Sequence, residues 1–352
     1  MPRNIEPHEK INKVYNRLWN LIHNRKAKSL SNLWKKIWWG RKTPIKLLKT
    51  ENENKLVIEM VLHARHYSLT LDKKKCVGCG VCMEVCPREA IQVTRTPKAE
   101  GEKAKAPTVA ISPENCHYCG ICEAVCPFGA LNIEVNGKPV IPVIRTESFP
   151  QLIREVNVDE TKCGLECLEI EDACPLGNIK VSVYTPNGKE VTDVKSKSKK
   201  KNLKVKVEID KESCPCCRLC ETKFPDGAIS VEKMFSGSLK VNSEKCPEGC
   251  QDCVDVCPIP GVLYLSDGKV QVNDSHCVYC GTCKIACPEE DALELTRTRI
   301  RHTEVRSGAW NKALEKLAST SAVIKEMENK NARKLKKVIM KRLPPEELDY
   351  NV

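Results

Sequence analysis

Short apolar segments with alternating polar positions recur along the chain, and each is followed by a polar turn and a cysteine. The six openings read SLTLDKKKC, VAISPENC, VNVDETKC, VEIDKESC, LKVNSEKC and VQVNDSHC. A period of two predicts strands with one buried face. Four residues before each cysteine stands an Asp, Ser or Asn, whose side chain can cap a turn by accepting backbone N–H bonds. These capping residues are Asp72, Ser112, Asp159, Asp210, Asn242 and Asn273.

A second apolar segment follows each group of cysteines. In chain order these segments are AIQV, ALNIEV, NIKVSV, AISVEK, VLYLS and ALELT. Each unit is therefore predicted to run strand, cysteine loop, short helix, strand. Six such units in tandem predict an α+β fold built from one repeated element.

The cysteine content decides what holds these small units together. Of the 352 residues 23 are cysteines and only 5% are aromatic, so large apolar cores are not expected. Disulfides are one candidate, but the start of the chain is polar and charged and does not read as a secretory signal. No apolar run approaches the roughly 18 residues of a membrane span. We therefore expect reduced, metal-bound cysteines in a cytoplasmic protein, with a peripheral position on the cytoplasmic face of the membrane as the alternative.

Four of the cysteine loops share one spacing. They read CVGCGVCMEVCP from Cys76, CHYCGICEAVCP from Cys116, CVYCGTCKIACP from Cys277 and, with one extra residue in the first gap, CPEGCQDCVDVCP from Cys246. Structural zinc sites pair two CxxC knuckles across a longer spacer, whereas three cysteines at i, i+3 and i+6 crowd a single ion. The spacing C-x2-C-x2-C-x3-C-P therefore predicts iron–sulfur clusters.

On these motifs the chain resembles the bacterial-type two-[4Fe-4S] ferredoxins, repeated in tandem as in the polyferredoxins of methanogenic archaea. The resemblance covers roughly residues 66 to 298 and implies three tandem pseudo-twofold dicluster modules with helical N- and C-terminal extensions. The implied domains are a basic, Trp-rich helical arm (1–65), three ferredoxin modules (66–136, 137–236 and 237–298) and a C-terminal helical extension (299–352). The polar stretches 96–108 and 186–202 are expected to be loops inside the first and second modules.

In that family three closely spaced cysteines of one unit and the fourth cysteine of its partner unit hold each cluster. Pairing the units in order implies five complete ligand sets. They are Cys76, Cys79, Cys82 and Cys126; Cys116, Cys119, Cys122 and Cys86; Cys214, Cys217, Cys220 and Cys174; Cys246, Cys250, Cys253 and Cys287; and Cys277, Cys280, Cys283 and Cys257.

The third and fourth units depart from the pattern. In CGLECLEIEDACP the third cysteine is replaced by Ile170, and in CPCCRLCETKFP Phe224 stands in the fourth position. Under the crossover rule both losses fall on one cluster, which keeps only Cys163 and Cys167. We expect this position to be empty and filled by apolar side chains, so that the chain holds five [4Fe-4S] clusters.

The fourth unit also carries an extra cysteine, Cys216. One alternative makes it the third ligand of a [3Fe-4S] cluster at the degenerate position. Another completes a [4Fe-4S] cluster there with Glu166 or another acid. A third leaves Cys216 as an ordinary buried thiol.

Charge is distributed unevenly. Residues 1–50 hold 13 Lys/Arg and two Glu, and residues 300–352 hold 12 Lys/Arg and seven acids, so the overall charge of +12 leaves −4 for the middle of the chain. Thiolates bound to iron make this middle part still more acidic. Two basic arms therefore flank an acidic body.

Both arms have apolar positions at helical spacing. The N-terminal arm, which also holds four of the five Trp, has Ile11, Val14, Tyr15, Leu18, Trp19 and Ile22. The C-terminal arm has Trp310, Ala313, Leu314, Leu317, Ile324, Leu335, Val338 and Ile339. We expect both arms to dock on other subunits; alternatives are the membrane surface or the chain's own body for the first, and a solvated helix for the second.

No catalytic residues are expected, because the chain has no phosphate-binding loop, no dinucleotide fingerprint and no cluster of histidines with carboxylates. One-electron transfer is the chemistry that remains, without a small-molecule substrate. The resemblance implies a polyferredoxin subunit of a multisubunit redox complex, first of all an energy-converting hydrogenase. The alternatives are the formylmethanofuran dehydrogenase or heterodisulfide reductase type, a free soluble carrier and, remotely, a nucleic-acid-associated iron–sulfur protein; no nucleic acid is expected as partner.

Overall fold

The computed structural model describes residues 46–99, 101–185, 187, 190–191 and 203–342. The contacts divide the chain into two compact units, residues 1–46 with 61–64 and residues 47–60 with 65–352. The elements described below lie in the second unit, apart from Lys46 and Val61 at the ends of two strands. The N-terminal amphipathic helix expected over residues 1–45 lies outside the described residues.

The first two cysteine units exchange strands. Strand β3 (His66–Asp72) of the first unit pairs antiparallel with β6 (Leu131–Val135) of the second. In return β4 (Ile91–Thr94) pairs with β5 (Thr108–Ile111). The opening strand of each unit is thus bonded to the closing strand of the other.

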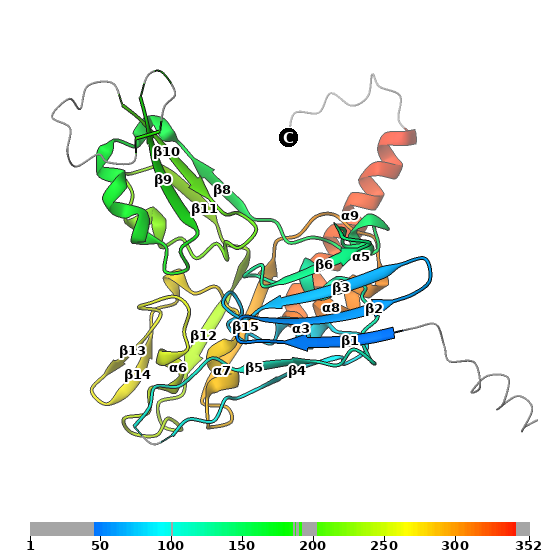
Figure 1. The fold of residues 1–352 in the computed structure, drawn as a ribbon, viewed down its shortest axis with the longest axis horizontal. Helices are drawn as coiled ribbons and strands as arrows, with labels where there is room; N and C mark the ends of the chain where they lie inside the picture. The colour runs from blue at the N-terminus through cyan, green and yellow to red at the C-terminus, as the bar shows by residue number, and fades with distance from the viewer. Residues whose placement is uncertain (1–45, 100, 186, 188–189, 192–202, 343–352) are drawn as a thin grey trace, which may run out of the picture. The chain divides into compact units, whose positions relative to one another are not determined.

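The same exchange recurs twice along the chain (Figure 1). In the third and fourth units, β8 (Glu155–Val158) pairs with β11 (Ile229–Glu232), and β9 (Ile179–Tyr184) with β10 (Lys204–Ile209). In the fifth and sixth, β12 (Phe235–Val241) pairs with β15 (Leu293–Ile300), and β13 (Leu263–Ser266) with β14 (Lys269–Val272). Units one with two, three with four, and five with six are therefore partners, as expected from the order of the motifs.

The predicted turn caps are confirmed in all six units. In each, the side-chain oxygen of the capping residue accepts a backbone N–H two or three residues further on, at 2.9 to 3.3 Å. The capping residues are Asp72, Ser112, Asp159, Asp210, Asn242 and Asn273. The turn that brings the first cysteine of each loop into place is thus fixed by one polar side chain.

The predicted short helices differ between intact and degenerate units. The four loops with the full cysteine spacing are followed by α-helices, namely α3 (Val81–Val85), α4 (Ile121–Ala124), α6 (Asp252–Asp255) and α7 (Thr282–Ala286). The third and fourth units form 3₁₀ helices instead, Leu165–Ala173 and Cys220–Thr222. Units that depart from the motif therefore also depart in backbone geometry.

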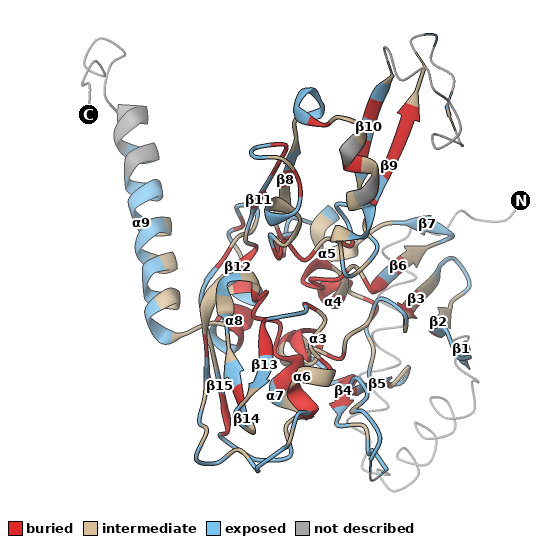
Figure 2. Ribbon diagram, turned by 90° about the vertical axis from the view of Figure 1, so that its left-hand side faces the viewer, coloured by how far each residue is buried: buried red, intermediate tan, exposed pale blue. Residues whose placement is uncertain are grey.

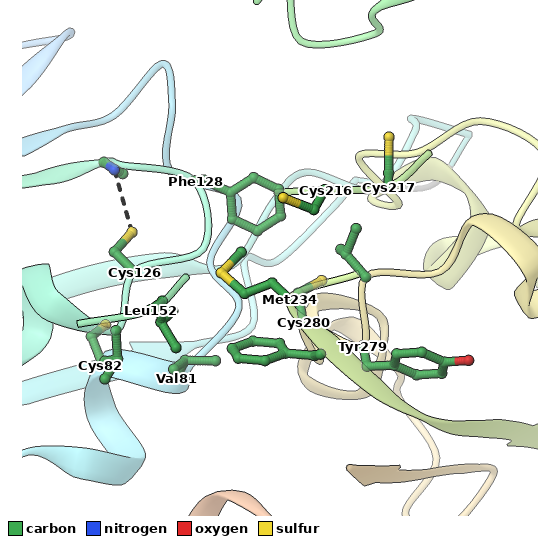
Figure 3. Packing of buried hydrophobic residues seen from close by; sticks show 14 of the residues in the cluster. Val81, Cys82, Cys126, Phe128, Leu152, Cys216, Cys217, Met234, Tyr279 and Cys280 are labelled. Atoms are coloured by element: carbon green, nitrogen blue, oxygen red, sulfur yellow. Dashed lines mark hydrogen bonds between the residues drawn. The ribbon is translucent and has the colours of Figure 1, made fainter. Parts of the chain in front are cut away.

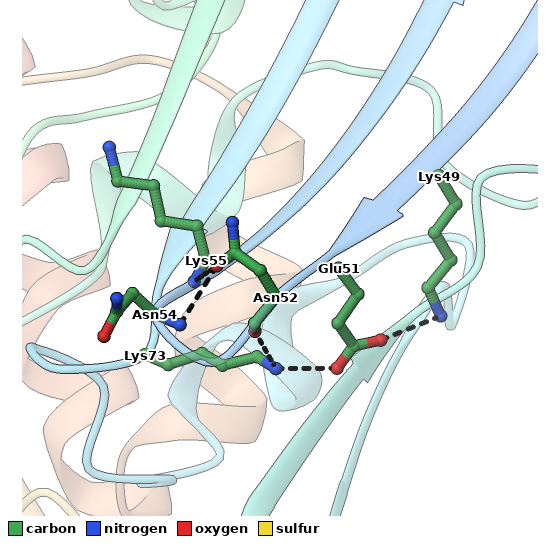
Figure 4. Close-up of polar contacts among 6 residues, drawn as sticks. All are labelled: Lys49, Glu51, Asn52, Asn54, Lys55 and Lys73. Carbon is green, nitrogen blue, oxygen red and sulfur yellow. Dashed lines mark hydrogen bonds and ion pairs between the residues drawn. The ribbon is translucent and has the colours of Figure 1, made fainter.

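The helical expectation for residues 1–65 is wrong over 46–61. Strands β1 (Lys46–Glu51) and β2 (Lys55–Val61) continue the sheet in the order β1-β2-β3-β6-β7, where β7 is Lys138–Pro139. Leu56 and Ile58 are buried at alternate positions of β2, which is the period of a strand. Figure 4 shows how the turn is tied: Lys73 Nζ donates at 2.8 Å both to Glu51 Oε1 and to the carbonyl of Asn52.

The C-terminal extension contains two helices where one was expected. Helix α8 (Gly308–Leu317) buries Trp310, whose ring meets Phe149 edge-on at 5.3 Å. Helix α9 (Thr320–Arg342) follows and is largely exposed in Figure 2, with Ile324 at 54% and Leu335 at 61% exposure. The first half of the expected apolar stripe is thus packed on the body, whereas the described second half faces solvent. The short helix α5 (Pro142–Arg145) precedes β8.

Candidate iron–sulfur sites

Four cavities are each lined by four cysteines. Each encloses about 350 to 410 Å³ of space not filled by atoms, including solvent at its mouth. The four groups are Cys76, Cys79, Cys82 and Cys126; Cys86, Cys116, Cys119 and Cys122; Cys174, Cys214, Cys217 and Cys220; and Cys257, Cys277, Cys280 and Cys283. In every cavity one cysteine comes from the partner unit, which is the arrangement that the crossover rule implies.

The fifth expected set is also brought together. Burial raises the pKa of Cys253 to about 12, and Cys287, Cys246 and Cys250 are the neighbouring thiols that raise it further. Cys287 belongs to the sixth unit and the other three belong to the fifth. The fifth set therefore combines the same two partner units that exchange β13 and β14.

The chemistry of these cavities fits a cluster with four sulfur-bound corners. Backbone amides donate to the sulfurs, as Tyr118 N does to Cys116 at 3.4 Å and Tyr279 N to Cys277 at 3.3 Å. The departing cysteines are bonded in the same way, since Ala90 N lies 3.3 Å from Cys86 Sγ. Such bonds stabilise the thiolate form that ligates iron. Among the described residues, no three His, Cys, Asp or Glu side chains are grouped so as to hold a single metal ion.

Burial makes most of these thiols poor acids in the absence of metal. It raises the pKa of Cys76 and of Cys116 to about 11, and that of Cys220 to about 12. Ligands must be deprotonated to bind metal, so iron has to displace these protons. Binding of iron to these loops would therefore release protons.

Cys216 is hydrogen-bonded to Cys214, a member of the complete ligand set of the fourth unit. It is 1% exposed, lies at φ 57°, and its thiol donates to the Cys214 carbonyl at 3.8 Å. A bond from the same thiol lowers the pKa of Cys214 to about 7. Figure 3 shows Cys216 among the buried residues of the core, which include Phe128 and Met234. These contacts favour the interpretation of Cys216 as a buried thiol beside a ligand.

The two cysteines of the degenerate position are buried, and the two residues that replace its other ligands are apolar. Cys163 is 8% exposed and Cys167 is fully buried. Phe224, in the position of the missing fourth cysteine, is 4% exposed, and Ile170 is partly buried against the core. Apolar packing at this position matches what an empty site would need.

Residues of the first unit, in and next to the loop over 96–108, contact helix α6 of the fifth unit, which the sequence did not reveal. Lys98 Nζ and Arg95 Nη2 both bind the carboxylate of Asp252, the Arg95 contact being 2.7 Å long, and Asp252 is almost fully buried in α6. The Ala104 amide donates to Asp255 Oδ2 at 3.0 Å. Charges so far apart in the sequence give no local signal of pairing.

Within the described part of the chain, no helix combines the length and apolarity that crossing a membrane requires.

Paired strand–loop–helix–strand units around cavities of four cysteines define an iron–sulfur protein of the ferredoxin class. A family model described as a 4Fe-4S dicluster domain matches residues 75–130. A chain of the formate dehydrogenase–heterodisulfide reductase–formylmethanofuran dehydrogenase complex from Methanospirillum hungatei is 32% identical, with a TM-score of 0.66 over 78% of this chain and 92% of that one. The chain therefore belongs to the polyferredoxins, the tandem [4Fe-4S] ferredoxin family that its motifs resemble.

Two curated proteins are similar over shorter segments. "F(420)H(2) dehydrogenase subunit I" of Methanosarcina mazei is 47% identical over 12% of this chain and 25% of its own length. The "Aliphatic sulfonate oxidoreductase, polyferredoxin-like subunit" of Pyrococcus furiosus is 31% identical over 23% of this chain and 53% of its own length. The chain thus matches between a quarter and about half of the length of these relatives.

Proposed function

We propose that the chain is a multi-cluster electron-transfer subunit of a multisubunit redox complex. The observation that supports this most directly is the set of cavities, each lined by three cysteines of one unit and one of its partner. Bound [4Fe-4S] clusters supply reversible one-electron chemistry at low potential. The chain's own residues supply thiolate ligands, amide donors to the sulfurs and apolar walls that exclude water, all of which set the potential.

We further propose three dicluster modules that together hold five clusters. The three repeated strand exchanges support three modules. The ligand sets are the five named above, and the position of Cys163 and Cys167 stays without a cluster. The apolar packing of Phe224 and the bond of Cys216 to Cys214 support the last point.

Among the candidate complexes, the similarity favours one with formylmethanofuran dehydrogenase and heterodisulfide reductase. The neighbour from Methanospirillum hungatei aligns over most of both chains and is part of such an assembly. The energy-converting hydrogenase expected first becomes the second candidate. The exposed helix α9 is a candidate contact with the neighbouring subunits.

Anaerobic purification of the native full-length chain tests this proposal. Mass spectrometry of the co-purifying proteins should identify subunits of formylmethanofuran dehydrogenase or heterodisulfide reductase, and dithionite should bleach the visible absorption of the complex. Hydrogenase subunits in their place would select the second candidate. A chain that purifies alone and is reduced reversibly would be a free carrier, and a chain without iron would contradict the proposal altogether.

A further inference from the structure

We propose that electrons cross directly from the first module to the third, between the cysteine loops that contain Cys79 and Cys280, and that Arg297 is the positioning residue that holds this crossing together. The proposal rests on the proposed function, because it requires clusters in both loops. It adds a route: electrons need not follow the order of the modules along the chain.

The two ligand loops touch through glycines. Gly281, next to Cys280, has φ 103°, and a Cβ placed on it would lie 3.3 Å from the Cys79 carbonyl oxygen. Gly80, next to Cys79, would place a Cβ 2.6 Å from Ile285 Cδ1. Because neither glycine carries a side chain, the backbone of the Gly281 loop lies against the backbone at Cys79, and the Gly80 loop lies against helix α7. Electron transfer becomes much slower with distance, so loops in contact form a favourable crossing.

Arg297 joins the pieces on both sides of the crossing. It lies on β15 with only 6% of its surface exposed. Its Nε donates to the Tyr279 carbonyl and its Nη2 to the Cys280 carbonyl, both at 2.8 Å. Its Nη1 is shared between the Leu317 carbonyl at 3.1 Å and Glu84 Oε2 at 3.2 Å.

These four acceptors come from three places. Two belong to the cysteine loop of the sixth unit, one to the end of α8, and Glu84 to α3, between Cys82 and Cys86 of the first unit. The planar guanidinium satisfies all of them from one point, which a lysine ammonium cannot do in the same geometry. Arg297 also brings a buried positive charge next to the Cys277–Cys283 loop, and positive charge favours the reduced state of a nearby centre.

A second contact keeps the same two modules in register. Arg95 and Lys98 of the first module bind Asp252, and Ala104 binds Asp255, on helix α6 of the third. The middle module also contacts both modules: Arg154 donates to the Cys126 carbonyl at 2.5 Å, and the carbonyl of Cys217 lies 3.2 Å from Nδ1 of His276, next to Cys277. The direct contact between the Cys79 and Cys280 loops nevertheless gives a route from module one to module three that does not enter the middle module.

The step itself is simple. One electron leaves the centre held by Cys76, Cys79, Cys82 and Cys126 and arrives at the centre held by Cys277, Cys280, Cys283 and Cys257, or moves in reverse. One centre is oxidised and the other reduced by one electron. No bond is broken and no proton moves.

Three variants of the cluster-loaded full chain test the crossing. Arg297→Gln removes the charge and most of the contacts, Arg297→Lys retains the charge, and Arg299→Gln changes an exposed arginine of the same strand as the matched control. Iron content reports whether the ligand sets survive. Paramagnetic resonance reports the midpoint potentials and the magnetic interaction between reduced centres. Samples frozen at intervals after rapid reduction report how fast electrons equilibrate between modules.

We expect Arg297→Gln to keep its iron and to lower the potential of the Cys277–Cys283 centre. Electron equilibration between the first and third modules should become roughly tenfold slower, because the two loops are no longer held at the same distance. Arg297→Lys should restore the potential but not the rate, and Arg299→Gln should match the parent. Unchanged rate and magnetic interaction in an iron-replete Arg297→Gln chain would overturn the proposal.

If Arg297→Gln loses iron, Glu84→Gln decides, because Glu84 is not itself a ligand and its side chain is partly exposed. It removes the ion pair to Arg297 at nearly constant shape and should slow equilibration with all iron retained; an unaltered rate would again overturn the crossing. A parent chain that holds its clusters and conducts, but shows no interaction between the two centres, would refute the crossing and leave the proposed function standing. A parent chain without clusters would refute the proposed function itself.

Discussion

Cys174 belongs to the third unit, yet it lines the same cavity as Cys214, the first cysteine of the fourth. Cys216, two residues from Cys214, does not line that cavity; its thiol bonds to Cys214 from outside. Cys216 is therefore nearer to Cys214 in the sequence, but Cys174 is the one that shares its cavity.

Replacing Cys174 by Ala should consequently remove a ligand from a complete set and give a [3Fe-4S] signal or an empty site. Replacing Cys216 by Ser should leave the number of clusters unchanged. Paramagnetic resonance and iron analysis of both variants provide the measurement. If Cys216→Ser loses a cluster while Cys174→Ala does not, the two units ligate iron in a different register.

The fully loaded chain should contain five clusters, which is about 20 iron atoms at four per cluster. The reason is that Phe224 and Ile170 stand where two ligands would be needed. Iron and acid-labile sulfide analysis of the anaerobically reconstituted protein checks the number. A count near 24 without a [3Fe-4S] signal would show that the degenerate position binds a sixth cluster.

Removal of iron should unfold the cysteine modules. Their buried thiols would be left around cavities with nothing inside, and metal binding and folding are one event in small domains of this kind. Circular dichroism of chelated protein should show loss of cooperative unfolding. Native-like secondary structure that still unfolds cooperatively after chelation would contradict this expectation.

Trp310→Ala should destabilise the chain by about 3 to 5 kcal/mol, because it empties a fully buried site. The lost contacts include the Phe149 ring and a 3.2 Å bond from Trp310 Nε1 to His302. Denaturant titration of the cluster-loaded protein measures the change. Leu335→Ala, at an exposed site on α9, is the control and should lie within about 0.5 kcal/mol of the parent.

Deleting residues 1–44 should leave the visible absorption unchanged, since no expected ligand lies there, and should abolish co-purification with the larger complex. The boundary follows from the structure, because a deletion extending to residue 50 would also remove most of β1. Comparing the two deletions separates loss of the arm from damage to the sheet. Co-purification that survives the shorter deletion would indicate that the arm does not dock on a partner.

Most elements of the fold could be predicted from the sequence pattern that repeats in each unit. The strands and the six capped turns followed from alternation and spacing, because each depends on residues close in sequence, whereas the grouping of cysteines across two units followed from the resemblance to dicluster ferredoxins. The segment KLVIEMV buries Leu56 and Ile58 at alternate positions, but it lies next to the Trp-rich arm, whose apolar spacing predicts a helix. Contacts such as Arg297 with Glu84 could not be predicted, because nothing local to either residue indicates its partner.

The exchange of β3 and β4 with strands of the next unit, and of one cysteine in each direction, also bears on how such a chain can be inherited. Deleting a single unit from the gene would remove the three ligands of one cavity and leave the cavity of its former partner without its fourth cysteine. Duplicating a single unit would create a cavity with no donor for its fourth corner. The chain can therefore gain or lose complete sites only in steps of two units. Mutations in two partner units can together cost a single cluster when both fall on the same ligand set.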